Sequence, residues 1–423
     1  MVTEVCNVDG TPAGKHERVV SYGAPRRVYG VRNLGGGLTV ATSCADLMHL
    51  TQVRASGLDV SYLNALASEL PIPGAMQTPY LAVFSVPPGF AITSSGRFPV
   101  RLSPSQTTRW AQTGTAPTKV SRALDVAMQH AVGQAKRVAV MGGGGVDSSA
   151  LFGLVHDMNR NHVQSALFSL CFDGEDSDLP YLDALEAHTG ARAHRFTPAE
   201  SSGRVQDALI MDAQPYLWPT GAWELEAALR AKAWGAEVLL TGAGGDDTFA
   251  PWWPNRWWSL PSRKKDRVHA YYTHARRAAA IASRGCLQSA AGIAVREPYV
   301  DLELVQTAAG FSAKELEPGG VSRGLLRHLM QRNVPREICH RQSKADFTPA
   351  LVAGVYDSSA WAYVRELGRG EALRSLGIGA AGILKEWFSK LDAEPTRGEL
   401  WAKLWPAISV EHFVRQWQAQ NPL

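Results

Sequence analysis

The chain has 423 residues, which is enough for about two or three domains with buried cores. Hydrophobic residues make up 45% of it and charged residues 19%, a globular balance that excludes a largely disordered protein. The formal net charge of +4 is small and spread along the chain, so we expect no nucleic acid as a partner.

Cysteine usage and hydropathy indicate the compartment. The five cysteines lie far apart and form no CxxC pair, which argues against a zinc site or a disulfide framework. No run approaches the ~20 apolar residues of a membrane span, and residues 1–10 lack the basic and apolar regions of a signal peptide. We therefore expect a cytoplasmic protein with reduced cysteines and no membrane partner.

The first part of the chain is predicted to be rich in β-structure. Between residues 29 and 101, short apolar runs alternate with turn residues such as those at 35–37 and 87–89. Residues 103–120, with two prolines among Ser, Thr and Gln, are expected to form a linker. The sequence thus predicts an N-terminal domain at 1–102 and a second domain at 121–423.

In the second domain, predicted strands and helices alternate. Apolar strands are expected at 137–142, 164–172, 192–198 and 237–242, and helices at 121–135, 147–158, 181–188 and 223–235. This alternation predicts an α/β fold with a doubly wound parallel sheet that is covered on both faces. After residue 252 the pattern becomes mostly helical, so we expect a helical C-terminal half.

A glycine loop between the first predicted strand of this sheet and the following helix carries the strongest functional signal. It reads Gly142-Gly143-Gly144-Gly145-Val146-Asp147-Ser148. The loop has neither the Lys and Ser/Thr of a Walker A motif nor the GxGxxG spacing of a dinucleotide motif. It fits the pyrophosphate loop SGGxDS, except that Gly143 replaces the first serine.

The chemistry of such a loop is adenylation by ATP. Gly143, Gly144, Gly145 and Ser148 are expected to hold the β- and γ-phosphates as one leaving group. Asp147 is expected to bind Mg²⁺, which neutralises the departing pyrophosphate. The alternative is a glycine-rich turn between a strand and a helix that binds no ligand.

A second loop brings further carboxylates to the same sheet edge. The strand at 237–242 runs into Thr241-Gly242-Ala243-Gly244-Gly245-Asp246-Asp247. We expect Gly242 beside the nucleotide and Asp246 sharing Mg²⁺ with Asp147, because the carboxyl ends of parallel strands meet at one edge. The alternative is that Asp246 and Asp247 only cap a helix.

These loops resemble those of the asparagine synthetase-like ATP pyrophosphatases, a family that includes asparagine synthetase, β-lactam synthetase and the lasso peptide cyclases. Arg296-Glu-Pro-Tyr-Val-Asp301 resembles the family segment RxPFLD, and residues 334–347 resemble LPxxxxxRxxKxxF, so the resemblance covers about residues 121–418. It implies that Lys344 is catalytic and stabilises the negative charge that develops at the acyl-adenylate. The alternative for Lys344 is a solvated helix residue.

The N-terminal domain departs from the glutamine-hydrolysing members of that family. Those members begin with Met-Cys and use the exposed cysteine as nucleophile, whereas this chain has Val2. Cys6 lacks the terminal amine that would serve as its base. The resemblance therefore implies a shortened, glutaminase-inactive domain, similar to a degenerate Ntn glutaminase fold, and a nitrogen source other than glutamine.

Residues that act near the amine in relatives are also replaced. Ala243 stands where asparagine synthetases carry Glu and β-lactam synthetase carries Tyr, and Ala294 stands where an acidic residue often precedes RxPFLD. Asp247 and Glu224 are the candidates for a general base. The tryptophans at 252, 253, 257 and 258 are expected either to shape a peptide chamber or to form ordinary core.

These features, together with residues 376–383, resemble most closely the actinobacterial lasso peptide cyclases. In that family ATP adenylates an Asp or Glu side chain of a peptide, and the α-amine of the peptide closes an isopeptide macrolactam. The resemblance implies a leader-processed peptide as substrate, with a leader peptidase and a leader-binding protein as partners. The alternatives are an amide synthetase that uses ammonia or a small amine, a nucleotide-binding protein without turnover, and an RNA-modifying pyrophosphatase.

Overall fold

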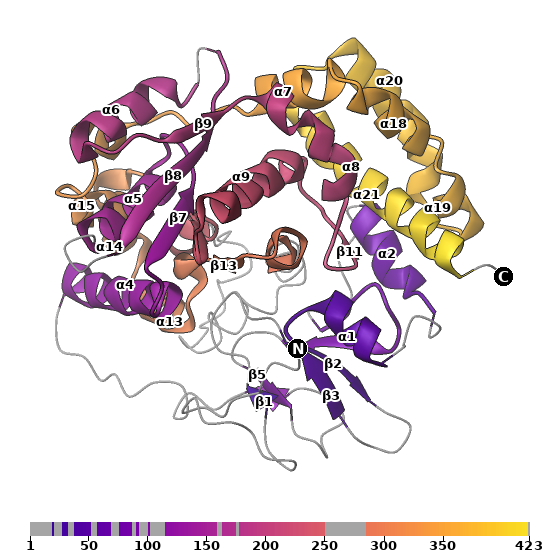
Figure 1. Cartoon of the computed structure of the whole chain (residues 1–423), viewed down its shortest axis with the longest axis horizontal. Helices are drawn as coiled ribbons and strands as arrows, with labels where there is room; N and C mark the ends of the chain where they lie inside the picture. Colours follow the sequence, from indigo (N-terminus) through magenta and orange to yellow (C-terminus); the bar gives the residue numbers. More distant parts are fainter. Residues whose placement is uncertain are drawn as a thin grey trace.

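A computed structural model describes most of the chain. The described residues are 19–20, 28–32, 38–51, 57–68, 76–86, 90–92, 100–101, 115–158, 163–174, 177–249 and 285–421. They form a mixed α/β structure with a parallel five-stranded sheet, a small N-terminal region of antiparallel strands and a helical C-terminal half (Figure 1). The predicted fold class is therefore confirmed.

The central sheet has its strands in the order β13-β12-β7-β8-β9, all parallel. The strands are β7 (Arg137–Met141), β8 (Gln164–Leu170), β9 (His194–Phe196), β12 (Val238–Thr241) and β13 (Ala294–Arg296). The chain adds β8 and β9 on one side of β7, then returns to add β12 and β13 on the other. The carboxyl ends of β7 and β12 are neighbours at this reversal, where open α/β sheets bind their ligands.

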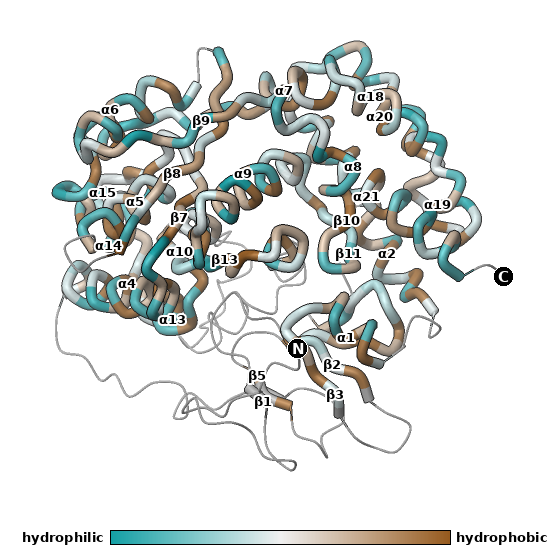
Figure 2. Tube along the Cα trace, in the orientation of Figure 1, coloured by the Kyte–Doolittle hydropathy of each residue, from teal (hydrophilic) through white to brown (hydrophobic). Residues whose placement is uncertain are grey.

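Side chains alternate between two cores along the strands, because successive residues of a strand point to opposite faces. Val140 of β7 packs with helices α4 (Ala116–Val132) and α5 (Val146–Asp157). Ala139 packs on the other face, which α9 (Gly221–Trp234) covers with its alanines. Figure 2 shows hydrophilic and hydrophobic residues alternating along α4, as expected for a helix with one side in solvent.

Further helices connect the strands and form the C-terminal half. They are α6 (Leu179–Thr189), α7 (Pro198–Ser201), α8 (Val205–Ala208), α10 (Gly245–Phe249), α13 (Leu302–Ala308), α14 (Ala313–Leu316), α15 (Gly324–Leu329), α16 (Arg336–His340), α17 (Thr348–Leu351), α18 (Ala360–Leu367), α19 (Glu371–Ser375), α20 (Ala380–Ala393) and α21 (Gly398–Gln420). Helix α21 buries Trp401 and Trp405 completely. None of the helices in the described ranges combines the length and apolarity needed to cross a membrane.

In its described residues, the N-terminal region has two small antiparallel sheets, with the strand orders β3-β2-β4 and β1-β5-β6, and two helices. Its elements are β1 (Val19–Val20), β2 (Val28–Arg32), β3 (Leu38–Ala41), α1 (Cys44–Thr51), α2 (Val60–Ala67), β4 (Val83–Val86), β5 (Phe90–Ile92) and β6 (Val100–Arg101). Helix α2 packs against α21, so a helix of the N-terminal region lies beside the last helix of the chain (indigo and yellow in Figure 1). The buried Asp212, in the hairpin of β10 (Ile210–Met211) and β11 (Gln214–Pro215), accepts the Cys44 N–H at 3.0 Å and ties α1 to the sheet domain.

The largest differences between the elements and the sequence predictions lie in three places. Helix α4 begins at Ala116, inside the expected linker, because Thr115 and Pro117 provide a favourable helix start. Strand β13 lies in a stretch that was predicted to be helical. It has only three residues, all paired with β12, and is too short for a strand pattern in the sequence. Helices α1 and α2 interrupt a region that was predicted as strands. Val2, Cys6 and the tryptophans at 252–258 lie outside the described residues.

Candidate active site

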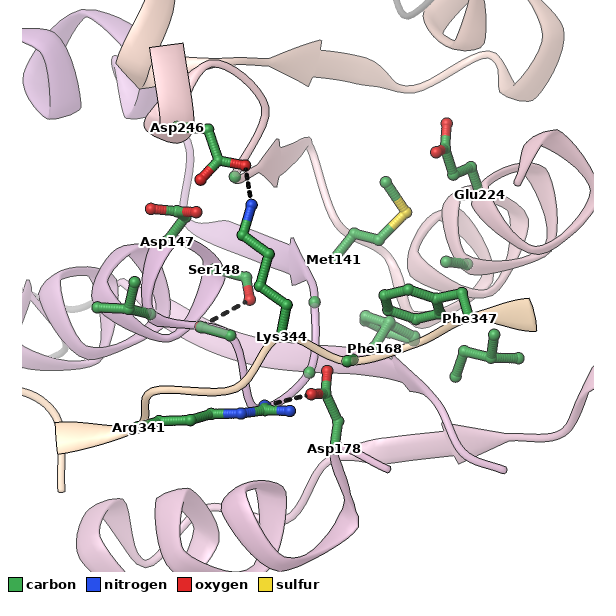
Figure 3. A pocket seen from close by; sticks show the side chains of 18 of the residues that line it. Met141, Asp147, Ser148, Phe168, Asp178, Glu224, Asp246, Arg341, Lys344 and Phe347 are labelled. Atoms are coloured by element: carbon green, nitrogen blue, oxygen red, sulfur yellow. Dashed lines mark hydrogen bonds and ion pairs between the residues drawn. The ribbon is translucent and has the colours of Figure 1, made fainter. Parts of the chain in front are cut away.

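The loops that follow β7 and β12 line one cavity of about 390 Å³ (Figure 3). The first loop leads into α5 and the second into α10. The predicted site residues that line the cavity are Gly143, Gly145, Asp147, Ser148, Gly242, Asp246 and Lys344. Gly144 and Asp247 are described as well and lie outside its lining.

The glycine loop is shaped by its contact with α6. A Cβ at Gly143 would clash with the carboxylate of Asp178, and a Cβ at Gly144 would clash with Tyr181. A Cβ at Gly145, in contrast, would meet no atom within 4 Å. The loop is thus pressed against α6 on one side and has open space at Gly145, which lets backbone N–H groups at the start of α5 approach an anion.

The two predicted metal-binding carboxylates lie close together, one in the first turn of α5 and one in the first turn of α10. Arg323, at the start of α15, bridges them: its Nη1 lies 2.5 Å from Asp147 Oδ2 and 2.7 Å from Asp246 Oδ1. Arg323 has the unusual backbone φ of 57°. The sequence analysis assigned this arginine no role, and no motif marks it.

The electrostatics of Asp147 reflect its burial. Burial raises the pKa of its carboxyl to about 6, against a usual value of 3.8, while Arg323 lowers the pKa and Asp246 raises it. Its second oxygen, Oδ1, is buried and has no hydrogen-bond partner among the described residues. A buried carboxylate oxygen in this state is available to a cation.

The donor set fits Mg²⁺ held together with a nucleotide. No group of three or more His, Cys, Asp or Glu residues in the described part of the chain could hold a metal ion by itself. Mg²⁺ typically takes one or two carboxylates and completes its shell with phosphate oxygens and water. Asp147 and Asp246 would supply those carboxylates, and the guanidinium of Arg323 now lies between them where positive charge is needed.

Lys344 reaches the same place from the segment between α16 and α17. Its Nζ lies 2.9 Å from Asp246 Oδ2, and its side chain is 58% exposed (Figure 3). Arg327 fixes the chain just before this segment, because its Nη1 donates to the carbonyls of Ile338 at 2.8 Å and Cys339 at 3.1 Å. The catalytic lysine suggested by the resemblance therefore lies next to the carboxylate predicted to bind the metal.

Arg341, in the same segment, forms hydrogen bonds with the glycine loop and with Asp178. Its Nη1 donates to Asp178 Oδ1 at 2.5 Å and to the carbonyl of Gly144 at 3.1 Å, and its guanidinium carbon lies 3.9 Å from the ring centre of Tyr181. The side chain is only 3% exposed. Arg341 is the arginine of the RxxK pattern in residues 334–347. That pattern could have identified it, but the sequence analysis assigned it no function.

The segment that resembles RxPFLD contacts the elements that carry the site residues. The hydroxyl of Tyr299 donates to the backbone carbonyl of Asp147 at 2.9 Å. Asp301 caps α13 by accepting the N–H of Glu303 at 2.9 Å. Neither residue lines the cavity, so in this chain the segment positions α5 and α13.

The far wall of the cavity is apolar and aromatic. It is formed by Met141, Phe168, Leu170, Phe196, Trp223, Ala227 and Phe347. Glu224, in the first turn of α9, is the acidic residue of this wall and lies on the opposite side of Figure 3 from Asp246. Ala243 and Ala294 lie outside the lining, so neither replaced position faces the cavity.

A doubly wound sheet with a glycine loop, two carboxylates and cationic side chains at its reversal point defines an α/β nucleotide-binding domain. The family model for asparagine synthase matches residues 119–287 and 280–415, which is more than half of the chain. The chain therefore belongs to the asparagine synthase family, whose members are ATP-dependent enzymes that form C–N bonds.

Two further comparisons were made. No curated protein matches the chain. Among solved structures, the chain is similar to the U34-tRNA thiolase NcsA from Methanococcus maripaludis with its 4Fe-4S cluster, at 12% identity over 66% of this chain and 79% of that chain, with a TM-score of 0.29.

Proposed function

We propose that the chain is an ATP- and Mg²⁺-dependent macrocyclase that forms an amide bond within a peptide. It activates an Asp or Glu side chain of the peptide as an adenylate, and the α-amine of the same peptide closes an isopeptide ring. The observation that carries this proposal is the meeting of Asp147, Asp246 and Lys344 in one cavity beside the glycine loop. Membership of the asparagine synthase family supports ATP-dependent C–N ligation.

In the first step a carboxylate oxygen of the peptide attacks the α-phosphorus of ATP, and pyrophosphate leaves. Gly143, Gly145 and Ser148 line the part of the cavity that would hold the pyrophosphate. Asp147 and Asp246 would hold Mg²⁺, which neutralises negative charge on the leaving group when it is bound. The nucleotide product of this step is AMP, because the bond to the α-phosphorus is the one that breaks.

In the second step the amine attacks the acyl carbon, AMP leaves and the amine nitrogen loses one proton. Negative charge develops on the acyl oxygen during the attack, and a cation already in place stabilises it. The ammonium of Lys344 lines the cavity and is held by Asp246, which supports this role. The reaction needs a peptide with a free α-amine, so a leader peptidase and a leader-binding protein are the proposed partners.

Product analysis tests the proposal. Purified protein is incubated with Mg²⁺, ATP and a linear core peptide that carries a free α-amine and an Asp or Glu side chain. We expect AMP and pyrophosphate by nucleotide separation, and a peptide lighter by one water by mass spectrometry. ADP and phosphate as products would overturn the adenylation step, and amide formation only with added ammonia would replace the macrocyclase by a simple amide synthetase.

A further inference from the structure

One carboxylate of the cavity has no basic partner among the described residues. Four acidic side chains line it, and three of them form ion pairs: Asp147 with Arg323, Asp178 with Arg341, and Asp246 with Arg323 and Lys344. The fourth is Glu224. No lysine or arginine of the described residues lies within ion-pair distance of it.

Two hydroxyl groups fix the Glu224 carboxylate. Thr220 Oγ1 donates to Oε1 at 2.5 Å, and the hydroxyl of the fully buried Tyr216 donates to Oε2. Each carboxylate oxygen can accept more than one hydrogen bond, so both keep accepting capacity for a ligand. The carboxylate is oriented by neutral donors, while its charge has no counterion from this part of the chain.

The neighbouring acidic residue of α9 shows the contrast. Glu226 is paired with Arg204 at 3.0 Å and Arg230 at 2.8 Å, on the side of the helix away from the cavity. Basic residues are therefore within reach of α9, yet none in the part of the chain that the structure describes pairs with Glu224. A partly buried carboxylate against an apolar wall is costly unless a cation accompanies it.

Two aromatic rings line the same wall of the cavity as this carboxylate. Trp223 and Phe347 stack with their ring centres 5.8 Å apart, and Phe347 is 37% exposed. Aromatic faces attract ammonium groups, so the rings and the carboxylate favour the same kind of ligand. Lys344 and Arg323 occupy the other side of the cavity and would repel a cation from there.

We propose that Glu224 binds a primary ammonium group, the protonated form of the substrate amine, with Trp223 and Phe347 on the same cavity wall; the ammonium gives up one proton to solvent before its nitrogen attacks the acyl carbon. This assignment rests on the proposed function for the identity of the ammonium as nucleophile. It places the amine on the wall opposite Asp246, so that the amine would reach the acyl carbon from the side away from the carboxylates proposed to bind Mg²⁺ (Figure 3). The N–H donors of a primary ammonium suit the free accepting positions of the carboxylate, which a quaternary ammonium cannot use.

The test measures binding of n-butylammonium to the full-length protein by ligand-observed NMR, independently of any turnover. Glu224→Gln keeps the shape and the hydroxyl contacts but removes the charge, and we expect it to weaken n-butylammonium binding about tenfold or more. Glu237→Gln is the matched control, because Glu237 lies before β12 at the end of the sheet away from the cavity and accepts backbone N–H groups. This control is expected to bind as the wild type does, and circular dichroism checks that both variants are folded.

Several results would overturn the assignment. They are wild-type binding of n-butylammonium by Glu224→Gln, equal binding of tetramethylammonium by the wild type, and a loss of ATP affinity in Glu224→Gln without a loss of n-butylammonium binding. The last result would show that the carboxylate contacts the nucleotide. ATP–pyrophosphate exchange by the wild type reports separately on the proposed function, so its failure would leave the binding result standing.

Discussion

Replacing Arg341, which binds the glycine loop, should destabilise the protein, and a second substitution at Asp178 should restore part of the lost stability. Arg341 and Asp178 are a buried pair, with side chains 3% and 10% exposed and a contact of 2.5 Å. Arg341→Met leaves the Asp178 carboxylate buried without its cation, which typically costs about 3–5 kcal/mol. Arg341→Met with Asp178→Asn leaves only a neutral amide, whose loss of a partner costs about 1–3 kcal/mol. The double variant should therefore be more stable than Arg341→Met by about 2 kcal/mol.

Denaturant-induced unfolding of the wild type, both single variants and the double variant measures these differences. ATP affinity of the same proteins reports on the loop, because Arg341 also holds the carbonyl of Gly144. We expect the double variant to regain stability without regaining full ATP affinity. A double variant that unfolds as easily as Arg341→Met would show that the charge left on Asp178 is not what destabilises the protein.

Three further predictions follow from the site and the core. Lys344→Ala should slow ring closure, because it removes about 2.7–4 kcal/mol of transition-state stabilisation, and Lys344→Arg should restore little of the rate. Mass spectrometry of AMP and macrocycle measures this effect, and a wild-type rate of ring closure in Lys344→Ala would show that the lysine has no catalytic role. Asp147→Asn and Asp246→Asn should each remove most turnover while the protein stays folded, because metal-assisted charge stabilisation supplies several kcal/mol; undiminished pyrophosphate release in both would contradict the site. Burial lowers the pKa of His412 to about 4 from a usual 6.5. The buried neutral form therefore contributes its full stabilisation above pH 6.5, and the free energy of unfolding should fall by about 3 kcal/mol as the pH falls toward 4. His412→Gln should show a smaller decline in unfolding experiments, and a decline equal to that of the wild type would contradict this role of His412.

The central fold followed from the sequence because local patterns and tertiary structure agree there. Apolar strands such as β7 and β12 are bounded by glycines, and helices such as α5 and α9 begin with a polar residue in the first turn. Strand β13 escaped prediction because three residues carry no periodicity, and only its pairing with β12 defines it. Helices α1 and α2 were missed although local caps mark both: Ser43 Oγ accepts the Asp46 N–H at 3.1 Å at the start of α1, and Asp59 Oδ1 accepts the Tyr62 N–H at 3.0 Å at the start of α2.

The candidate site was predictable where one loop holds a whole motif. Asp147, Asp246 and Lys344 meet because the sheet order brings β7 and β12 together and Arg327 holds the lysine segment. Arg323 was not predictable, because its ion pairs with Asp147 and Asp246 join residues from distant parts of the chain. Glycine patterns report backbone geometry, whereas the partners of a buried charge are decided by residues that come from distant parts of the chain.

The charges around the cavity indicate the form in which ATP binds. The lining has as many cationic as anionic side chains, namely Arg323, Arg327, Arg341 and Lys344 against Asp147, Asp178, Glu224 and Asp246. Free ATP would meet a cavity in which Arg323, Arg341 and Lys344 are already engaged by carboxylates, and Asp147 and Asp246 would repel its phosphates. A divalent cation between those two carboxylates removes the repulsion and leaves Arg323 and Lys344 to face the phosphates. ATP should therefore bind much more weakly in excess EDTA than with Mg²⁺ by isothermal titration calorimetry, and Asp246→Asn should reduce this difference. Equal affinity in both conditions would mean that the carboxylates stay paired with Arg323 and Lys344 when ATP is bound.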